Sequence, residues 1–528
     1  MMQNLTKYLN FETVALFVLC AVAVFARSSS MTDTNLIPKQ LYSWFALSAV
    51  IILFSAKTLL GKRLNIDFYA WSIIIMSICS LEAIYAIFQW GVNHYLHLNS
   101  VYVTGHFDNP AGLMACLCVS LPFALYVYSR TMQHKPLVLG AIVLIYLGII
   151  VSQSRTGIVI GAFVMACYFM RQKRLSLRRI CIIAIAMAVV MIVVSYFVNQ
   201  DSANGRLLIW RCCWDMTKDE PITGYGLGGF RRLYMDYQAA YLQANPDCPF
   251  TMLAANVNFP FNEYINLYLC FGILGYICLG LIVALLIVCY RIYPTSAARY
   301  AFLSLAIIAF ISIFSYPFTY PITWVICLVS ILIIVYNNFL NIKRSRTVIA
   351  SIVFIIIGIV GLCYSYNDIK GEIKWADAYQ CNDLVKYKDV SKDLRNNPYF
   401  LYSYAITLLE KGEIDESLGV ALQCDKLLSN YDLELILGDI YTEKGEYNQA
   451  EFHYQKALQM CPCRFMPLNA LYDMYIKSGD GNKAHKMAQL VIDKPIKVKS
   501  RTVSAIKYKM QRVMQPDKEN NEAINTQN

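Results

Sequence analysis

The chain has 528 residues, of which 57% are hydrophobic and 15% charged, with a formal net charge of +11 at pH 7. Soluble proteins average about a quarter charged residues, so this composition excludes an ordinary soluble protein. The 18 cysteines show no zinc-type pairing of one CxxC with a second CxxC or HxxxH, and a chain of this length is not a disulfide scaffold. We therefore predict neither a metal site nor a cofactor.

Apolar runs long enough to cross a bilayer recur along the first two thirds of the chain. They predict an all-α polytopic bundle of about eleven spans, over residues 11–26, 41–56, 68–90, 110–128, 136–152, 157–170, 180–198, 263–290, 300–316, 320–340 and 347–366. The first run contains Ala21-Val22-Ala23, which imitates a signal-peptide cleavage site, but only Lys7 precedes it. We therefore predict an uncleaved first span. The transmembrane domain occupies residues 1–366 and includes a long loop at 199–262.

Lysine and arginine alternate between the two sides of this predicted topology. One set of loops is rich in them: Lys57, Lys62, Arg63, Arg130, Lys135, Arg171, Lys173, Arg174, Arg178, Arg179, Arg291, Arg299, Lys343, Arg344 and Arg346. The short loops of the other set hold only Arg27, Lys39 and Arg155. Because cytoplasmic loops carry the excess of positive charge, we predict a cytoplasmic N-terminus, and an outer position for the long loop and for everything after residue 366. The net charge is then a topology signal and does not indicate nucleic acid.

A polar stretch, TGHFDNPAGLMA, precedes the fourth predicted span on the outer face. Asn109-Pro110 is typical of a helix start, with Asn as the N-cap and Pro in the first position. His106 is one of six histidines and one of the few outer groups able to accept a proton near neutral pH. The stretch is thus either a simple helix start or part of a site.

Three arginines lie on the outer face, where the topology rule disfavours them: Arg155, Arg206 and Arg211. Guanidinium groups bind phosphate oxygens in a bidentate manner, so the three could hold a lipid pyrophosphate and stabilise it as a leaving group. The alternative for each is an ordinary ion pair with a carboxylate of the long loop: Asp215, Asp219 or Glu220.

The long loop also contains Gly224, Gly226 and Gly229, which match the GxGxxG spacing of dinucleotide-binding loops. No βαβ unit precedes them, so we predict a tight turn after Pro221 instead.

The eighth predicted span opens with Asn262 and Glu263. Glu263 is either a solvated residue at a helix start or a functional acid, and the sequence leaves both possibilities open. Within the same span, the spacing of Gly272 and Gly275 permits close helix packing.

The chain after residue 366 has a different character. LELILGDIYTEKGEYNQAEFHYQKALQMCP fits the tetratricopeptide pattern, and Gly412 and Gly479 lie 33 and 34 residues from Gly445. We predict a soluble α-solenoid of tetratricopeptide-like repeats at 367–512, for which an unrelated bundle of helical hairpins is the alternative. Residues 513–528 are predicted to be a disordered tail.

Four of these stretches together resemble the O-antigen ligase and polymerase superfamily, the WaaL/Wzy-like membrane glycosyltransferases. HFDNPAGLMA is similar to the family's F-x-N-P/R-N-x-x-A element, and SQSRTG to its S-R-T/G-x element. GRLLIWRCCWDMTKDEPITGYGLGGF resembles R-x-x-x-W…D/H-P-x-x-G-x-G-x-G-x-F, and FNEYINLYLCFGILG resembles H-N/S/Q-x₉-G-x-x-G. The resemblance covers residues 70–366 and keeps the order of the elements, and some relatives also carry a periplasmic repeat domain.

The resemblance implies a metal-independent glycosyltransferase of the GT-C type in the bacterial inner membrane. Such an enzyme transfers a glycan from undecaprenyl pyrophosphate to an acceptor hydroxyl on the periplasmic face. Carried over by motif, Arg155 and Arg206 bind the diphosphate and Arg211 assists. We expect four further residues to support the site: Asn109, Asn262, Trp210 and Asp219.

One departure from the family concerns the proton acceptor. The family's histidine corresponds to Phe261 in this chain, and phenylalanine cannot accept a proton. The catalytic candidates are therefore Glu263 and His106; otherwise the acceptor needs little base help, or the chain is inactive. Loss of a general base alone typically costs about 10²–10⁴-fold in rate.

Several functions share this scaffold: a ligase to lipid A–core, a polymerase of repeat units and an oligosaccharyltransferase to protein hydroxyls. The repeats favour a protein partner or acceptor slightly, because solenoids present concave binding surfaces. Two other classes are a polysaccharide transporter, for which Glu82 is the only charged residue inside the predicted spans, and a non-enzymatic scaffold. The expected partners are the lipid-linked glycan donor and an acceptor that is lipid A–core, a glycan or a protein.

Overall fold

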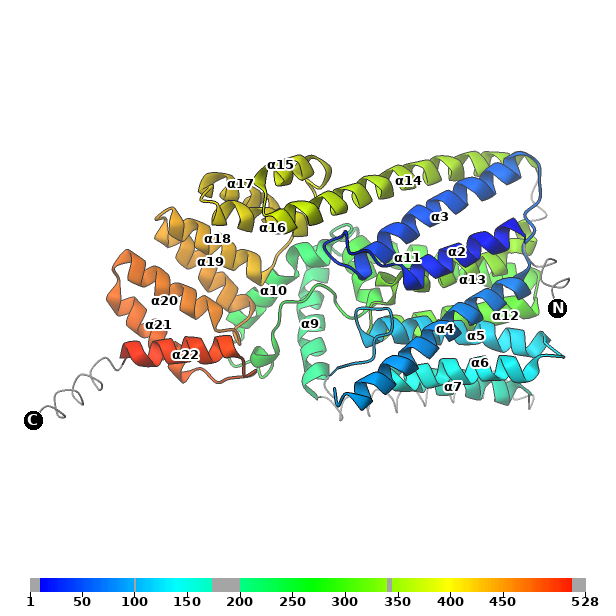
Figure 1. The fold of residues 1–528 in the computed structure, drawn as a ribbon, viewed down its shortest axis with the longest axis horizontal. Helices are drawn as coiled ribbons and strands as arrows, with labels where there is room; N and C mark the ends of the chain where they lie inside the picture. The colour runs from blue at the N-terminus through cyan, green and yellow to red at the C-terminus, as the bar shows by residue number, and fades with distance from the viewer. Residues whose placement is uncertain (1–9, 99–100, 173–199, 340–343, 515–528) are drawn as a thin grey trace, which may run out of the picture. The chain divides into compact units, whose positions relative to one another are not determined.

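A computed structural model describes residues 10–98, 101–172, 200–339 and 344–514. Within these ranges the chain forms α-helices and short 3-10 turns and contains no strand (Figure 1), which confirms the all-helical prediction. The chain divides into two compact units. The first comprises Met1–Val198, Phe261–Tyr264 and Tyr276–Gln380, and the second comprises Asn199–Pro260, Ile265–Gly275 and Cys381–Asn528.

Apolar helices make up the first unit, and each predicted span within the described residues coincides with one of them. They are α2 (Phe11–Phe25), α3 (Leu36–Leu59), α4 (Phe68–Tyr95), α5 (Pro110–Arg130), α6 (Lys135–Val151), α7 (Arg155–Gln172), α11 (Glu263–Ile292), α12 (Ser296–Phe314), α13 (Pro321–Phe339) and α14 (Arg344–Cys381). By length and composition, seven of them can cross a membrane: α3, α4, α5, α11, α12, α13 and α14. Helices α2, α6 and α7 are shorter apolar helices, and the predicted span 180–198 lies outside the described residues. The chain is thus a multi-pass membrane protein, and the count of eleven spans stays a prediction.

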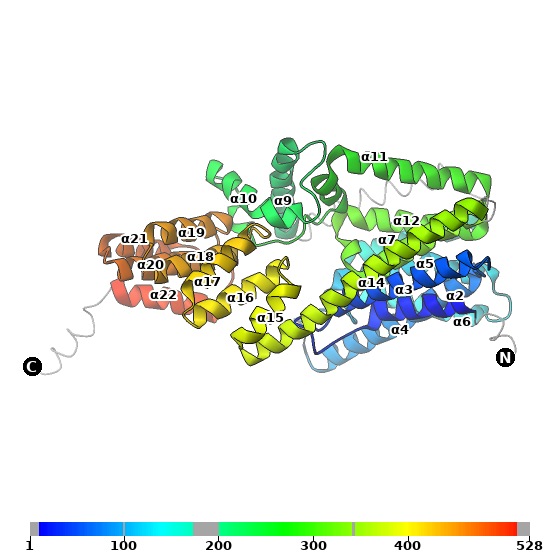
Figure 2. The same cartoon turned by 90° about the horizontal axis from the view of Figure 1, so that it is seen from above.

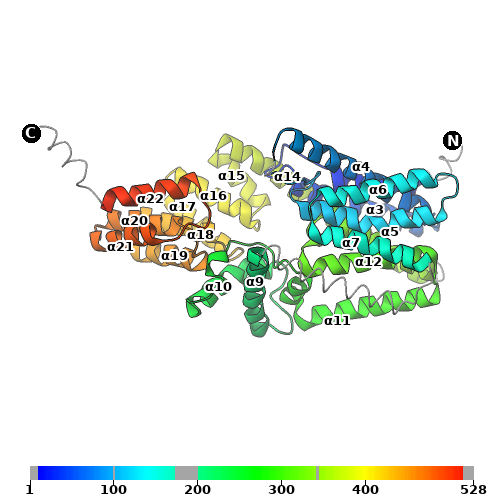
Figure 3. The same cartoon turned by 90° about the horizontal axis from the view of Figure 1, so that it is seen from below.

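Helix α5 forms the core of the bundle. Its side chains are buried without interruption from Gly112 to Val127, as expected for a helix that is apolar on all sides. Helices α4, α6, α7 and α12 pack against it (Figure 3). The Ser304 hydroxyl of α12 donates a hydrogen bond of 2.9 Å to the Val119 carbonyl of α5, which satisfies a buried polar group inside the bundle.

Helix α14 runs beside α3 (Figures 1 and 2). A Cβ at Gly358 or at Gly361 would lie 2.6 Å from a side-chain atom of Ile52 or of Ser48, respectively, so the two helices approach closely through small residues. Helix α14 continues without interruption past residue 366 to Cys381. The domain boundary at 366 stays a prediction.

The second unit combines the long loop with the C-terminal helices. Its helices are α9 (Gln200–Asp219), α10 (Gly229–Ala244), η1 (Thr251–Leu253), α15 (Leu384–Asp393), α16 (Pro398–Glu410), α17 (Ile414–Asp425), α18 (Tyr431–Glu443), α19 (Tyr447–Met460), α20 (Met466–Ser478), α21 (Gly481–Asp493) and α22 (Arg501–Met514). Helix α10 packs against α19. The buried Gln238 donates to the Met460 carbonyl at 2.7 Å, and Lys456 lies 2.8 Å from Asp236.

The C-terminal helices of this unit pack in successive pairs, α16 with α17, α18 with α19 and α20 with α21. Gly412, Gly445 and Gly479 each follow the first helix of a pair and have φ values of 81°, 76° and 81°, the left-handed region that glycine adopts without strain. At Gly438 a Cβ would lie 2.3 Å from the Tyr454 ring. The spacing predicted from sequence therefore marks equivalent turns, while the tetratricopeptide assignment itself stays a prediction. Helix α22 ends at Met514, and residues 515–528 lie outside the described ranges.

Candidate functional site

His106 is fixed at one end of the first unit by a buried carboxylate of α4. The ring nitrogen Nδ1 of His106 lies 2.7 Å from Oε2 of Glu82, and the His106 backbone N–H donates to Oε1 at 2.8 Å. Glu82 is fully buried, whereas the His106 side chain keeps 20% of its surface exposed. The Tyr85 and Phe25 rings pack on the imidazole, with centroids 4.1 and 5.1 Å away. The carboxylate thus holds Nδ1 as a donor and leaves Nε2 able to accept a proton.

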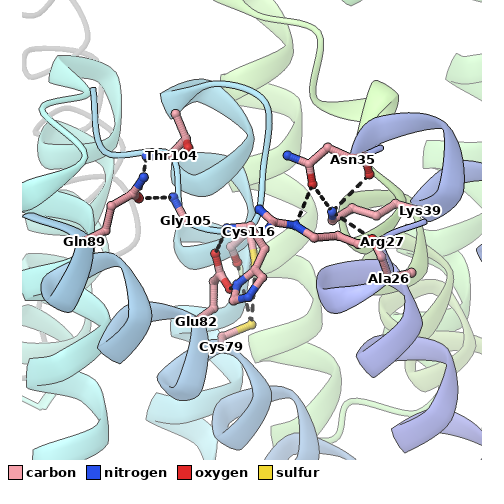
Figure 4. A network of polar contacts seen from close by, with 11 residues as sticks. Ala26, Arg27, Asn35, Lys39, Cys79, Glu82, Gln89, Thr104, Gly105 and Cys116 are labelled. Carbon is pink, nitrogen blue, oxygen red and sulfur yellow. Dashed lines mark hydrogen bonds and ion pairs between the residues drawn. The ribbon is translucent and has the colours of Figure 1, made fainter. Parts of the chain in front are cut away.

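The loop that carries His106 is attached to α4 by a second polar side chain. Oε1 of Gln89 accepts the backbone N–H groups of Thr104 and Gly105 at 3.1 and 2.9 Å (Figure 4). Glu82 and Gln89 are seven residues apart, two helical turns, and so project from the same face of α4. Gly105 has φ +62°, and a Cβ there would lie 2.0 Å from Oε1 of Glu82. Only glycine fits this position, and the sequence analysis did not identify it.

Asn109 begins α5 as predicted. Its Oδ1 accepts the N–H groups of Ala111 and Gly112 at 2.8 and 3.2 Å, and Pro110 occupies the first helical position. Its Nδ2 donates to the hydroxyl of Tyr320 at 2.6 Å and to that of Tyr316 at 3.3 Å. The N-cap interpretation is confirmed, and the same side chain also joins α5 to the segment before α13.

Phe261, Asn262 and Glu263 lie at this end of the first unit as well. The Phe261 ring packs edge-on against Tyr316, with centroids 5.4 Å apart. Oδ1 of Asn262 accepts the Tyr264 N–H at 2.9 Å at the start of α11, and Oε1 of the half-buried Glu263 accepts the Phe318 N–H at 3.2 Å. Contacts through Tyr316 and the adjoining 3-10 turn η2 (Pro317–Thr319) therefore connect Glu263 with Asn109. Glu263 acts here as a hydrogen-bonded residue at a helix start.

Two cations that the sequence analysis counted only as topology charges also lie near His106. Nζ of Lys39, in the first turn of α3, is buried and donates to the Ala26 carbonyl, the Asn35 carbonyl and Asn35 Oδ1 at 3.0, 3.1 and 2.6 Å (Figure 4). Nε of the exposed Arg27 donates to Asn35 Oδ1 at 3.3 Å. The signal that could have identified Arg27 was already present, because it is an arginine on the face that disfavours arginine.

Arg155 is the first residue of α7, and its side chain is exposed. The neighbouring Gly157 carbonyl accepts a weak hydrogen bond from the Cys118 thiol of α5 at 3.6 Å, and a Cβ at Gly157 would touch Met114. Since Met114 lies in the second turn of α5, Arg155 lies near the end of the bundle that carries Asn109. Its guanidinium group makes no side-chain hydrogen bond or ion pair with the described part of the chain.

Arg206 and Arg211 belong to the second unit, where both lie in α9. Five residues along an α-helix correspond to about 140° of rotation, so the two side chains leave α9 from different faces. Arg211 is exposed and pairs with Asp215 at 3.2 Å, the ordinary ion pair considered from sequence. Trp210, on nearly the same face as Arg206, donates from Nε1 to the Pro260 carbonyl at 2.9 Å. The predicted grouping of all three arginines stays a prediction.

Asp219 ends α9 and accepts a hydrogen bond from the Tyr237 hydroxyl of α10. Burial and this carboxylate raise the pKa of Tyr237, so its hydroxyl remains a donor at neutral pH. The Tyr225 hydroxyl also lies 3.0 Å from that of Tyr237 and donates to the Met216 carbonyl at 2.8 Å. Asp219 thus joins α9 to α10.

The glycine-rich turn packs against a break in α11. Helix α11 is interrupted at Gly272, which has φ 58° and ψ −151°. The N–H groups of Tyr225 and Gly226 donate to the Leu269 and Cys270 carbonyls at 2.7 and 3.0 Å, and the Ile273 N–H donates to the Pro221 carbonyl at 3.0 Å. A Cβ at Gly272 would lie 2.2 Å from the Ile222 carbonyl oxygen. The turn after Pro221 is confirmed, but Gly272 admits the backbone of a loop and not a second helix.

Within the described ranges, no three His, Cys, Asp or Glu side chains gather closely enough to bind a metal ion. No curated protein matches the chain. The model of the O-antigen ligase family matches residues 140–280, from α6 to the middle of α11. The match includes Arg155, Arg206 and Glu263, whereas His106 and Asn109 lie before it. Through this domain, the chain belongs to the O-antigen ligase superfamily.

Proposed function

We propose that the chain transfers a glycan from undecaprenyl pyrophosphate to an acceptor hydroxyl, at the end of the first unit that carries His106. The family match supports glycan transfer in polysaccharide assembly. The observation that carries the proposal is the 2.7 Å contact between Nδ1 of the partly exposed His106 and the buried Glu82 carboxylate. A histidine oriented in this way by a carboxylate is a suitable general base.

The proposed reaction is a single displacement. Nε2 of His106 takes the proton of the acceptor hydroxyl while the hydroxyl oxygen attacks the anomeric carbon of the donor glycan. The bond from that carbon to the pyrophosphate oxygen breaks, and undecaprenyl pyrophosphate leaves with the electron pair. Glu82 stabilises the imidazolium that forms. Base catalysis of this kind contributes about 10²–10⁴-fold, so His106 takes over the task that Phe261 cannot perform.

Cationic side chains stabilise the leaving group in this proposal. The family resemblance assigns the diphosphate to Arg155 and Arg206, and the exposed Arg27 adds a third candidate beside His106. Preorganised cations facing developing charge are typically worth 10²–10³-fold in rate. Arg211 is a weaker candidate because Asp215 already pairs with it.

The hydrogen-bonding role of Glu263 favours His106 over Glu263 as the base. Glu263 lies at the first position of α11 and its carboxylate already accepts the Phe318 N–H, whereas Nε2 of His106 has no recorded acceptor role. The distribution of lysine and arginine supports a periplasmic location for this end, in the inner membrane, with the N-terminus in the cytoplasm.

Deletion of the gene followed by glycan analysis tests the proposal and separates its variants. Loss of long-chain polysaccharide from lipid A–core identifies a ligase, and capping by single repeat units identifies a polymerase. Exported proteins without glycans identify an oligosaccharyltransferase. Complementation with H106Q is expected to fail, and complementation with H94Q, which changes an exposed histidine at the end of α4, is expected to succeed. A deletion strain with unchanged polysaccharide and glycoproteins would refute glycan transfer.

A further inference from the structure

A cavity of about 500 Å³ lies between α3, α13 and α14, where α3 ends and α14 begins. Such a volume is typical of sites for organic ligands and exceeds what a phosphate ion needs. Its lining residues come from the last two turns of α3, the turn that follows, α13 and the first turns of α14: Phe54, Ser55, Thr58, Gly61, Lys62, Arg63, Leu64, Leu332, Tyr336, Arg344, Thr347, Ala350, Ser351 and Phe354.

The inner wall of the cavity is apolar. Phe54 of α3, Leu332 of α13 and Phe354 of α14 line it, and each of these helices can cross a membrane. The hydroxyl of Tyr336, which also lines it, already donates to the Leu64 carbonyl at 2.9 Å. This wall therefore suits a hydrocarbon chain and offers a polar solute few partners.

The mouth of the cavity is cationic. Lys62, Arg63 and Arg344 line it with exposed side chains, and none of the three makes a side-chain ion pair or hydrogen bond with the described residues. A Cβ at Gly61 would lie 3.1 Å from Nη2 of Arg344, so this guanidinium group lies over the turn that ends α3.

Local carboxylates do not neutralise this charge. The described lining residues include no acidic side chain. Glu12, which lies at the same end of the bundle, is already bound by Lys57 Nζ at 2.5 Å and by the Asn65 N–H at 3.1 Å. Helix α14 also begins at Arg344, and the free backbone N–H groups of a helix's first turn favour an anion. Three unpaired cations at an apolar cavity therefore need an anionic ligand with a hydrocarbon part.

We propose that this cavity binds one anionic glycerophospholipid of the adjacent leaflet. Lys62, Arg63 and Arg344 hold the phosphate, and an acyl chain lies against Phe54 and Phe354. Basic pockets between transmembrane helices on the cytoplasmic side bind acidic head groups. Topology alone explains basic residues at this end of the bundle, but it does not explain why they surround a cavity.

The cavity is distant from the proposed catalytic end. Lys39, beside His106, lies in the first turn of α3, and Thr58 of the cavity lies in its last turn. Nineteen residues of α-helix span roughly 28 Å at 1.5 Å per residue, about the thickness of the hydrocarbon core. The proposed lipid therefore occupies the opposite leaflet, and its binding does not depend on glycan transfer.

Native mass spectrometry of the purified full-length chain in detergent, titrated with phosphatidylglycerol, tests the proposal. We expect one tightly held phosphatidylglycerol and weak binding of phosphatidylcholine. The double variant R63Q/R344Q should bind phosphatidylglycerol about 30-fold more weakly, because each basic residue near acidic head groups contributes about tenfold or slightly less. The matched control is R130Q/R299Q, which removes the same charge at the same end outside the cavity and should stay within threefold of wild type.

Two further arms distinguish the sources of binding. A350F fills the cavity and keeps all three cations, so it should lose the lipid; wild-type affinity in A350F would show adsorption to surface charge and overturn the proposal. Equal affinity for phosphatidylcholine would also overturn it. Competition by glycerol 3-phosphate at the same concentration would assign the site to a soluble phosphate, and preferential displacement by undecaprenyl phosphate would assign it to the carrier lipid; either result contradicts the proposed ligand.

Discussion

Replacing Gly105 with alanine should disconnect His106 from its carboxylate. Gly105 has φ +62°, and a Cβ there would lie 2.0 Å from Glu82 Oε1. Because a carbon–oxygen contact needs about 3.3 Å, the loop or the carboxylate must move by more than about 1 Å. The left-handed backbone adds about 1–2 kcal/mol of strain for alanine.

Such a displacement breaks the geometry of the His106–Glu82 pair. A misplacement of 1 Å at a reacting group can cost about 10²-fold in rate, so G105A should transfer glycan about 100-fold more slowly than wild type. The assay measures transfer from purified lipid-linked glycan in membranes that contain equal amounts of each variant.

The matched control is G91A, which adds the same methyl group in α4 where no heavy atom lies within 4 Å of the new Cβ. We expect G91A to stay within twofold of wild type. A G105A variant that transfers glycan at the wild-type rate would refute the view that the loop must hold His106 against Glu82.

Three further outcomes follow from the second unit. R211Q should retain at least half of the transfer rate in the same membrane assay, because Arg211 pairs with Asp215; a loss of 100-fold would contradict this. Burial raises the pKa of Asp439, so its charged form costs stability, and this cost appears as the pH rises through the folded-state pKa. D439N should therefore melt at a higher temperature than wild type at pH 7 and lose this advantage below about pH 4; lower stability at pH 7 would contradict the reasoning. K456M leaves the fully buried Glu434, 2.7 Å away in the native chain, with one partner fewer, and should lower the free energy of unfolding by about 3 kcal/mol; an unchanged denaturation midpoint would show that the pair contributes nothing.

Local sequence patterns predicted much of the fold. Helical spans follow from continuous apolar runs, and the start of α5 follows from Asn109-Pro110, because these signals depend on neighbouring residues. The equivalent turns at Gly412, Gly445 and Gly479 were visible for the same reason. All of these features need no knowledge of what packs against them.

The sequence did not predict the contacts that make the candidate site. Glu82 was considered only as a possible transport residue, and its partner His106 lies 24 residues away in a loop. The requirement for glycine at Gly105 arises from this same carboxylate and has no local signature. An ionisable residue inside a span calls for a named partner, and a search for one would have led to His106.

The long loop shows the same limitation. Its helices α9 and α10 have mean compositions too polar for a membrane, which sequence detects, but their association with α19 depends on Gln238 and Lys456 contacts across more than 200 residues. The glycine-rich turn was predicted, whereas the break in α11 at Gly272 that receives it was not. Helical periodicity does not reveal where a helix is interrupted by a backbone from elsewhere.

The pH dependence of glycan transfer by wild type, E82Q and H106Q tests the central claim most directly. The account predicts that H106Q is at least 100-fold slower at every pH, and that E82Q shifts the pH at which the rate is half-maximal upon loss of the adjacent anion, because a carboxylate stabilises protonated histidine. The removal of that anion lowers the pKa of His106, so the half-maximal pH of E82Q should be lower than that of wild type. Transfer by H106Q at the wild-type rate, or an identical pH profile in E82Q, would contradict the assignment of His106 as the base.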